Sequence, residues 1–428
     1  MELRATTDRL LIPAGIRARR IVRLDLTAPV APPSHRHPEL ALALVLDRSA
    51  SMLGDKFELA REATLQAIRS LAPEDRFSVV VYDDQVDVVQ PMAPVTPESV
   101  TAAEAALAAI GGRGMTDLLG GWLAGCEQVA CGLEEGRLGR VLLLSDGQAT
   151  HGVTRTSRIL VHVGEVRSRG VATSTFGIGE DFDQGLMAGM AENGGGNFRY
   201  VATAAEIPSC LEDEMGEVLE VTLPGVEVAV DADLREPVRC VNGYPVEHGD
   251  DGARLLVGDL ASGQVVSAFL DVVVPATAEG ETRAASFLVR SGPYVAREQV
   301  AWTAVSFAEH HAQPVDRELR RERARMEARR GERAALEVRQ KSGWAEAVDE
   351  VRRTQDEIRR EALGDPEVLR IADELESVEQ LMAAPQVLRL LVKRHAEAAY
   401  ALKGRQSGGA ATRTPGESRE PAVPVNAR

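Results

Sequence analysis

Hydrophobic residues along this chain follow different periods in successive segments. Between residues 40 and about 203, continuous apolar runs alternate with segments whose apolar residues recur every three or four positions. Runs such as LALALVLD at 40–47 predict buried strands of a parallel sheet, and the recurring positions predict amphipathic helices. The first such helix places Phe57, Ala60 and Ala67 on one face. The alternation predicts a doubly wound, mostly parallel α/β sheet that binds ligands at the carboxyl ends of its strands.

The segments on either side of this region have the period of half-buried strands. Val22, Leu24 and Leu26 fall on one face of a strand, with polar residues between them. Strand-like pieces separated by turn residues recur over 225–305, which predicts a β-sandwich. We expect the strands near the N-terminus to join this sandwich, so that the α/β domain is an insertion within it.

The remainder of the chain is expected to be helical and then disordered. After Pro314 the sequence offers many opposite charges four residues apart, which is typical of a solvated helix face. The final segment is rich in Gly, Pro, Ser and charge, so it is expected to lack a core. The predicted organisation is as follows: 1–38 N-terminal strands, 39–205 α/β domain, 206–224 linking helix, 225–311 β-sandwich, 312–404 helical region and 405–428 disordered tail.

Charge and composition narrow the classes of partner. The formal net charge of −16 repels polyanions and disfavours nucleic acid. Residues 1–20 lack the apolar core of a signal peptide, and the apolar run at 40–46 is too short to span a bilayer. We therefore expect a cytoplasmic protein with no membrane partner. The four cysteines form no CxxC pair and are interpreted as buried thiols in a reducing compartment: Cys126, Cys131, Cys210 and Cys240.

One set of oxygen-bearing side chains falls at the expected strand ends. Asp47, Ser49 and Ser51 form a D-x-S-x-S motif where the first buried strand ends, Thr116 lies in the loop GGRGMTD, and Asp146 ends the segment VLLLSD. Two carboxylates and three hydroxyls suit Mg²⁺ or Mn²⁺ better than zinc. The two carboxylates balance the charge of a dication, and the five side chains leave one coordination position open. An incoming carboxylate would be its strongest ligand. The alternative is that the hydroxyls only cap the following helix.

These five residues reproduce the metal-ion-dependent adhesion site of von Willebrand factor A domains, and the α/β segment resembles that family. The resemblance extends to LVLDRSASMLGDKFELARE, LLLSDGQATHG and FGIGEDFDQGLMAGMAENGGGNFRYV. It implies direct metal contact from Ser49, Ser51 and Thr116, with Asp47 and Asp146 often bonding through water. It also implies protein ligands whose acidic side chain completes the metal shell.

The flanking segments are similar to a narrower group, in which β-structure surrounds the A domain. Bacterial von Willebrand A proteins and inter-α-trypsin inhibitor heavy chains belong to it, and LLVGDLASGQVVSAFLDVVVP is the most similar piece. The C-terminal helices resemble those of some bacterial proteins and of plant ubiquitin-ligase-like proteins. Because the chain lacks the cysteine-rich ligase module and the secretion features of the heavy chains, neither activity is carried over.

Several other residues near these strand ends have both a functional and a structural interpretation. Arg48, Gln148 and His151 are candidates for the rim of the metal crevice, although His151 also suits a solvated loop. The pair at 83–84 could extend a two-metal hydrolase site, but a hairpin turn is the simpler interpretation.

Two motifs elsewhere in the chain have mainly structural interpretations. Gly177 and Gly179 form a lone GxG, which favours a tight turn over dinucleotide binding, and no P-loop motif is present. Trp122 and Trp344 are expected to pack within helices.

The function that these observations favour is a non-enzymatic adaptor whose metal site captures a carboxylate of a protein partner. Bacterial A-domain proteins often act beside an AAA+ ATPase or a kinase–phosphatase pair, so these are the expected partner systems. One alternative is a Mg²⁺-dependent phosphohydrolase, which would need a general base such as His151. The other is a scaffold that oligomerises through its C-terminal helices.

Overall fold

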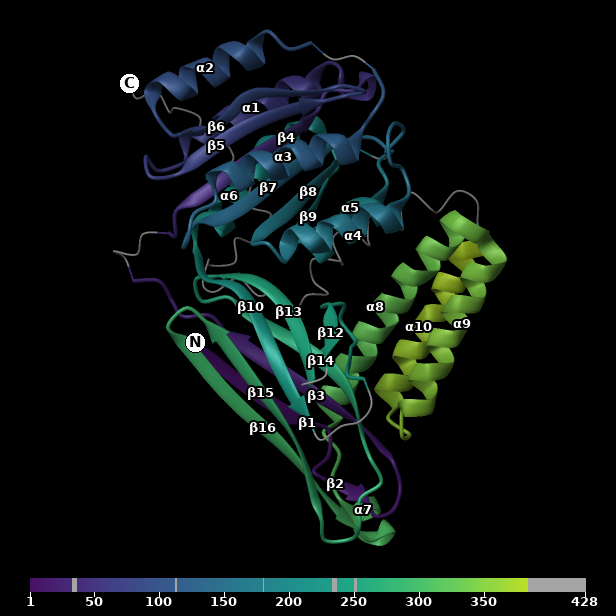
Figure 1. The fold of residues 1–428 in the computed structure, drawn as a ribbon. Helices are drawn as coiled ribbons and strands as arrows, with labels where there is room; N and C mark the ends of the chain where they lie inside the picture. The colour runs from purple at the N-terminus through teal and green to yellow at the C-terminus, as the bar shows by residue number, and fades with distance from the viewer. Residues whose placement is uncertain (33–36, 112–113, 180, 233–236, 250–251, 384–428) are drawn as a thin grey trace, which may run out of the picture.

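The computed structural model describes residues 1–32, 37–111, 114–179, 181–232, 237–249 and 252–383, which form three parts (Figure 1). An α/β domain lies at one end of a β-sandwich, and a bundle of helices lies beside both. The chain begins in the sandwich, passes into the α/β domain and then returns to the sandwich. None of the described helices is long and apolar enough to cross a bilayer.

The α/β domain is built on a six-stranded sheet with the order β6-β5-β4-β7-β8-β9. Only β6 runs antiparallel, as the hairpin partner of β5. Even-numbered residues of β4 pack into the helical layer on one face and odd-numbered residues into the layer on the other, so the strand is apolar throughout. The strands are β4 Leu40–Asp47, β5 Arg76–Tyr82, β6 Val86–Pro94, β7 Leu138–Ser145, β8 Val171–Ile178 and β9 Gly195–Val201.

Helices cover both faces of this sheet (Figure 1). One layer consists of α1 Asp55–Arg69, α2 Pro97–Ala108 and α6 Ile207–Leu219, and the other of α3 Leu118–Gly132, α4 Thr156–Arg167 and α5 Gln184–Gly194. Trp122 of α3 is fully buried and donates a hydrogen bond from Nε1 to Thr173 Oγ1 at 3.1 Å. The fold class expected from the hydrophobic pattern, a doubly wound sheet with a sandwich and C-terminal helices, is confirmed.

The helix expected to link the domains is part of the α/β domain. Leu211 and Met215 of α6 are buried in the same apolar core as α1. Strand β10 begins soon afterwards, at Val221, so little of 206–224 serves as a connection. Burial of its apolar face explains why this helix packs on α1 instead of bridging through solvent.

The β-sandwich combines strands from both sides of the α/β domain. Its sheets have the orders β1-β3-β14-β11 and β12-β13-β10-β15-β16-β2, and their inner faces share one apolar core. The N-terminal strands are β1 Glu2–Thr7, β2 Leu11–Pro13 and β3 Ala18–Thr27. The later strands are β10 Val221–Ala232, β11 Arg239–Cys240, β12 Val246–Gly249, β13 Gly252–Ala261, β14 Val265–Val274, β15 Thr282–Ser291 and β16 Tyr294–Val305.

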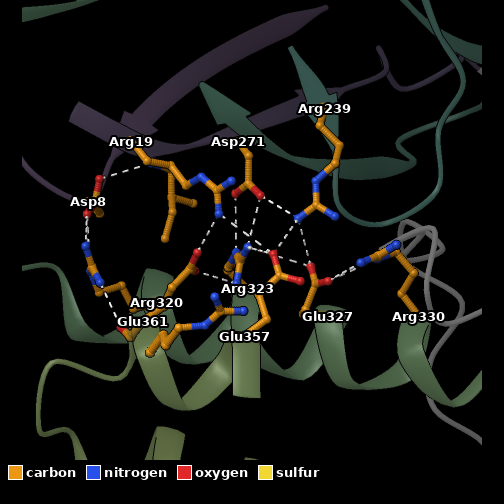
Figure 2. Close-up of polar contacts among 12 residues, drawn as sticks. Asp8, Arg19, Arg239, Asp271, Arg320, Arg323, Glu327, Arg330, Glu357 and Glu361 are labelled. Atoms are coloured by element: carbon orange, nitrogen blue, oxygen red, sulfur yellow. Dashed lines mark hydrogen bonds and ion pairs between the residues drawn. The ribbon is translucent and has the colours of Figure 1, made fainter. Parts of the chain in front are cut away.

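The C-terminal bundle is held against the sandwich by buried charges. Its helices are α8 Arg317–Ser342, α9 Trp344–Glu361 and α10 Pro366–Ala383, preceded by the short α7 Phe307–Ala312. Figure 2 shows Asp271 of β14 between Arg239 of β11 and Arg323 of α8, with Nη2 to Oδ2 distances of 2.7 Å and 2.9 Å. Arg323 also contacts Glu361 of α9 at 2.6 Å. Further along, α8 reaches the α/β domain, where Arg333 pairs with Glu192 of α5 (Figure 1).

Several expectations need correction. Trp344 begins α9 with 60% of its surface exposed, because it precedes the buried stripe of that helix. Cys131 is exposed, Cys210 and Cys240 are partly buried and only Cys126 is buried, although all four cysteines are free thiols. Strand β1 lies within the N-terminal strands expected over 1–38, although its alternation of exposed and buried residues is weak. The predicted disordered tail at 405–428, and the helical region beyond 383, lie outside the described residues.

Candidate metal centre

Three loops at the carboxyl edge of the sheet, together with the last residue of β4, carry the five predicted ligands. We call residues 48–54 loop 1, 114–117 loop 2 and 146–155 loop 3. Asp47 ends β4, and Ser49 and Ser51 follow in loop 1. Thr116 lies in loop 2 before α3, and Asp146 opens loop 3 directly after β7. Because β4 and β7 are neighbouring parallel strands, their ends bring loops 1 and 3 to the same edge.

The structure brings all five side chains together. Ser49 Oγ and Ser51 Oγ lie 3.1 Å apart, and Ser51 Oγ donates to Asp146 Oδ1 at 2.7 Å. Asp47 Oδ1 accepts the backbone N–H of Ser49 at 2.8 Å. Oxygens of three residues face Gly147, where an added methyl carbon would lie 3.5 Å from Thr116 Oγ1, 3.8 Å from Ser51 Oγ and 3.9 Å from Asp47 Oδ2. Oxygen ligands from all three loops therefore surround one small space.

Backbone hydrogen bonds hold the loops in this arrangement. The N–H groups of Thr150 and His151 both donate to Thr116 O, at 3.0 Å and 3.1 Å. Thr116 N donates in return to Thr150 Oγ1 at 3.1 Å, which joins loops 2 and 3. Ala50 N donates to Gly114 O at 3.4 Å and joins loop 1 to loop 2. The position of Thr116 is thus set by hydrogen bonds of its backbone.

The buried carboxylate of Asp47 is costly to ionise without a cation. Burial raises the pKa of Asp47 to about 6, although hydrogen bonds from Ser145 and Ser49 oppose the shift and the charge of Asp146 adds to it. Ser145 Oγ donates to Asp47 Oδ2 at 2.6 Å. A dication bound between the two carboxylates would offset this cost, so the donor set fits a metal.

Lys56 and Ser145 complete the site but were missed from the sequence. The Lys56 ammonium forms an ion pair with Asp146 Oδ2 and lies 3.4 Å from Ser51 O. Its side chain is 35% exposed, so it occupies the rim. The available signals were its place in the first turn of the helix after D-x-S-x-S, and the position of Ser145 immediately before Asp146.

The kind of donor atom at this centre limits which metal ions it would bind. Within the described ranges, no group of three or more His, Cys, Asp or Glu side chains is placed to hold an ion. A metal at this centre would therefore depend on hydroxyl oxygens for much of its coordination. Such oxygen donors suit Mg²⁺ or Mn²⁺ better than zinc.

The predicted rim residues differ in their exposure to solvent. Arg48 is only 4% exposed, and its guanidinium pairs with Asp83 at 3.0 Å and with Asp87, so the expectation that it contacts a partner is wrong. Its positive charge instead balances the buried carboxylate of Asp83. Gln148 and His151 are exposed on loop 3. The carboxylate of Asp83 is occupied by Arg48 and by the N–H of Gln85 at 2.7 Å, which disfavours a second metal there.

The two glycines of the GxG motif allow a side chain to pack closely and the backbone to turn. A side chain at Gly177 would overlap the ring of Phe182, and Gly179 has a φ of +80°, which favours glycine. These constraints explain both glycines without a dinucleotide.

The doubly wound sheet, with oxygen-bearing side chains at its carboxyl edge, has the fold of the von Willebrand factor type A domains. Residues 41–213 match the von Willebrand factor type A domain, so the chain contains such a domain. Domains of this type that keep the adhesion site bind divalent metals and mediate protein–protein interactions.

Curated relatives share the domain at low identity. The Escherichia coli K12 protein YfbK is 25% identical over 215 residues, which cover 50% of this chain and 37% of YfbK. Human inter-alpha-trypsin inhibitor heavy chain H4 is 28% identical over 191 residues, which cover 43% of this chain and 20% of that protein. The chain therefore aligns with well under half of the length of each of these two relatives.

Solved structures match the whole architecture. The von Willebrand factor type A protein from Catenulispora acidiphila has a TM-score of 0.68 at 15% identity, covering 93% of this chain and 96% of that chain. The ArnB paralog VWA2 from Sulfolobus acidocaldarius has a TM-score of 0.59 at 14% identity, covering 92% and 97%. At these identities the likeness shows a shared fold, which includes the parts outside the type A domain.

Proposed function

We propose that this protein is a binding module that captures a carboxylate of a protein partner through Mg²⁺ or Mn²⁺. The ion would be held by Asp47, Ser49, Ser51, Thr116 and Asp146. The observation that carries the proposal is the meeting of these five side chains, from the end of β4 and three separate loops, around one space at the sheet edge. When bound, the metal would supply an electrophilic position that accepts an oxygen ligand.

The charges around the centre favour an anionic ligand. Asp47 and Asp146 balance the two charges of the ion, and Lys56 adds one positive charge at the rim. With metal bound, the centre therefore carries a net positive charge, which a single incoming carboxylate neutralises.

The surroundings support binding over hydrolysis. A phosphohydrolase needs a general base or nucleophile beside the metal. Asp83 is engaged by Arg48, and His151 contributes its backbone N–H to Thr116 while its side chain lies on an exposed loop. We therefore propose a non-enzymatic role, with an AAA+ ATPase or a kinase–phosphatase system as the partner class that the family resemblance implies.

Metal binding is tested with Asp47→Ala and Asp146→Ala. Each variant should lose Mg²⁺ and Mn²⁺ in titration calorimetry while its circular dichroism spectrum is unchanged, because the sheet is held by apolar burial. Asp55→Ala, which removes the same charge from an exposed position near the site, should keep its metal affinity. Unchanged affinity in either ligand variant would rule out the assignment.

The role of the metal centre in partner binding is tested with Thr116→Ala. Its hydroxyl adds direction but no formal charge, so its loss should weaken partner capture more than metal retention. Pull-downs from lysate would compare wild type, Thr116→Ala and chelator-treated wild type. Equal recovery of one partner in all three would exclude the metal crevice as the binding surface.

A further inference from the structure

We propose that Leu53, Met115 and Val153 form an apolar collar around the metal centre that selects a single partner carboxylate flanked by apolar side chains. This inference rests on the proposed function and adds the chemistry of the partner. The three side chains are 57%, 52% and 36% exposed. Each of the three ligand-bearing loops contributes one of them.

The local backbone places the collar residues next to the ligands. Leu53 follows Ser51 by two residues in loop 1, and Met115 immediately precedes Thr116 in loop 2. Val153 follows His151, whose N–H is bonded to Thr116 O at 3.1 Å. Gly152 packs so closely on Asp117 that an added methyl carbon would lie 2.5 Å from Asp117 Oδ1. Loop 3 is thereby held against loop 2 beside Val153.

In these loops polar side chains are buried and apolar side chains are exposed, which is the reverse of the usual arrangement. The polar ligands Asp47, Ser49 and Thr116 are almost fully buried. The collar side chains beside them keep between 36% and 57% of their surface exposed, although each is apolar. Met52, between Ser51 and Leu53, is fully buried, so the loop has access to the core and still leaves Leu53 outside. Exposed apolar side chains on loops that also carry a polar site are typical of an interaction surface.

Charge decides which carboxylate the collar accepts. The protein carries a net charge of −16, so a partner segment with a run of acidic residues would be repelled. Near the centre, Lys56 contributes one positive charge at the rim. A segment with one Asp or Glu between apolar residues matches both the single net charge at the metal and the apolar rim.

Two fluorescein-labelled peptides test this inference on the full chain: Gly-Ser-Leu-Glu-Leu-Ser-Gly and Gly-Ser-Ser-Glu-Ser-Ser-Gly. In Mg²⁺ the leucine-flanked peptide should bind about tenfold more tightly in anisotropy titrations, equivalent to about 1.4 kcal/mol. The same peptide with Gln in place of Glu should not bind. Leu53→Gln and Met115→Gln should reduce the preference without changing metal affinity. Leu10→Gln is the matched control, because Leu10 is 63% exposed on the sandwich.

Each result distinguishes the two proposals. Equal, metal-dependent binding of both peptides, or an undiminished preference in the collar variants, would overturn the collar and leave the carboxylate site standing. Binding that ignores chelation would overturn both. Metal-dependent self-association, measured as a rise in molar mass, would assign the collar to a second copy of this chain and also overturn the inference.

Discussion

At the residue scale, the metal centre depends on carboxylates that are buried beside one another. Asp47 and Asp146 are 0% and 2% exposed, and within the described part of the chain Lys56 is the cation that pairs with Asp146. Their behaviour toward protons and toward Lys56 gives two predictions.

Metal affinity should fall below about pH 6. A proton competes with the ion for Asp47, whose pKa burial raises to about 6. Above that pH the carboxylate is already charged and affinity should be nearly constant, whereas each pH unit below it should weaken binding about tenfold. Calorimetric titration with Mn²⁺ at about pH 7.5 and about pH 5 checks this, with circular dichroism as the control for folding. Equal affinities would contradict it.

Replacing Lys56 should affect metal and partner in opposite directions. Lys56→Met removes the ammonium that occupies Asp146 Oδ2, so metal affinity should rise by about threefold. The same change removes a positive charge from the rim, so the leucine-flanked peptide should bind more weakly. Lys56→Arg, which keeps the charge, is the control. If Lys56→Met and Lys56→Arg have the same metal affinity, the ion pair does not compete with the metal.

At the scale of elements, α6 is fastened to the edge of the sheet by a buried acid. Glu214 is fully buried and accepts hydrogen bonds from Ser174 Oγ at 2.6 Å, Asn197 Nδ2 at 3.1 Å and Arg199 Nε at 2.8 Å. Burial disfavours its charge, but Arg199 and Ser174 outweigh that cost and hold the pKa of Glu214 below its usual value.

Glu214→Gln should therefore destabilise the α/β domain by about 3 kcal/mol near pH 7, because it leaves Arg199 without its buried counter-charge. Glu217→Gln on the same helix is the matched control, since Glu217 is 31% exposed and its pair with Arg199 should contribute less than about 1 kcal/mol. Urea unfolding measures both variants, and equal midpoints would contradict the prediction.

The effect should also depend on pH. Because the folded-state pKa of Glu214 is lowered, its contribution is complete above the unfolded pKa of about 4.3 and is lost as the pH falls through the folded value. The difference in unfolding midpoint between wild type and Glu214→Gln should shrink as the solution is acidified toward that value.

At the scale of the whole molecule, charges join the three parts. Arg140 of β7 pairs with Asp259 of β13, and Asp271 of β14 is shared by Arg239 and Arg323 (Figure 2). Burial opposes the charge of Asp271, but both guanidinium groups outweigh it and keep its pKa below the usual value. The bundle thus docks through ions that are stable only while paired.

Asp271→Asn should loosen the bundle from the sandwich. Arg323 is 2% exposed and would lose its closest counter-charge on the sandwich. Hydrogen exchange in α8 and α9 should increase about tenfold or more at neutral pH, while exchange in the central α/β strands is unchanged. Asp373→Asn, which breaks the exposed pair with Arg359 in the bundle, should leave exchange unaltered. Unchanged protection of α8 in Asp271→Asn would show that apolar contacts alone dock the bundle.

The elements with a strong, local hydrophobic pattern could be predicted from the sequence alone. The continuous run of β4, the amphipathic face of α1 and the alternation of strands and helices predicted the doubly wound sheet. Because parallel strands end at one edge, the same pattern also predicted which loops would meet, and the structure brings Asp47, Ser49, Ser51, Thr116 and Asp146 together. Periodicity is enough for such inferences, since it reflects burial along a single element.

Which charged and apolar side chains lie inside depends on the packing of elements that are distant in the sequence. Arg48 resembles a rim residue in sequence but lies buried against Asp83, and Trp344 resembles a core residue but is exposed. The contact of Lys56 with Asp146 joins residues 90 positions apart. Hydrophobic periodicity likewise could not predict that Leu53, Met115 and Val153 are exposed on three separate loops. Burial of a charge depends on whether a distant partner reaches it, and that is settled only when separate elements pack together.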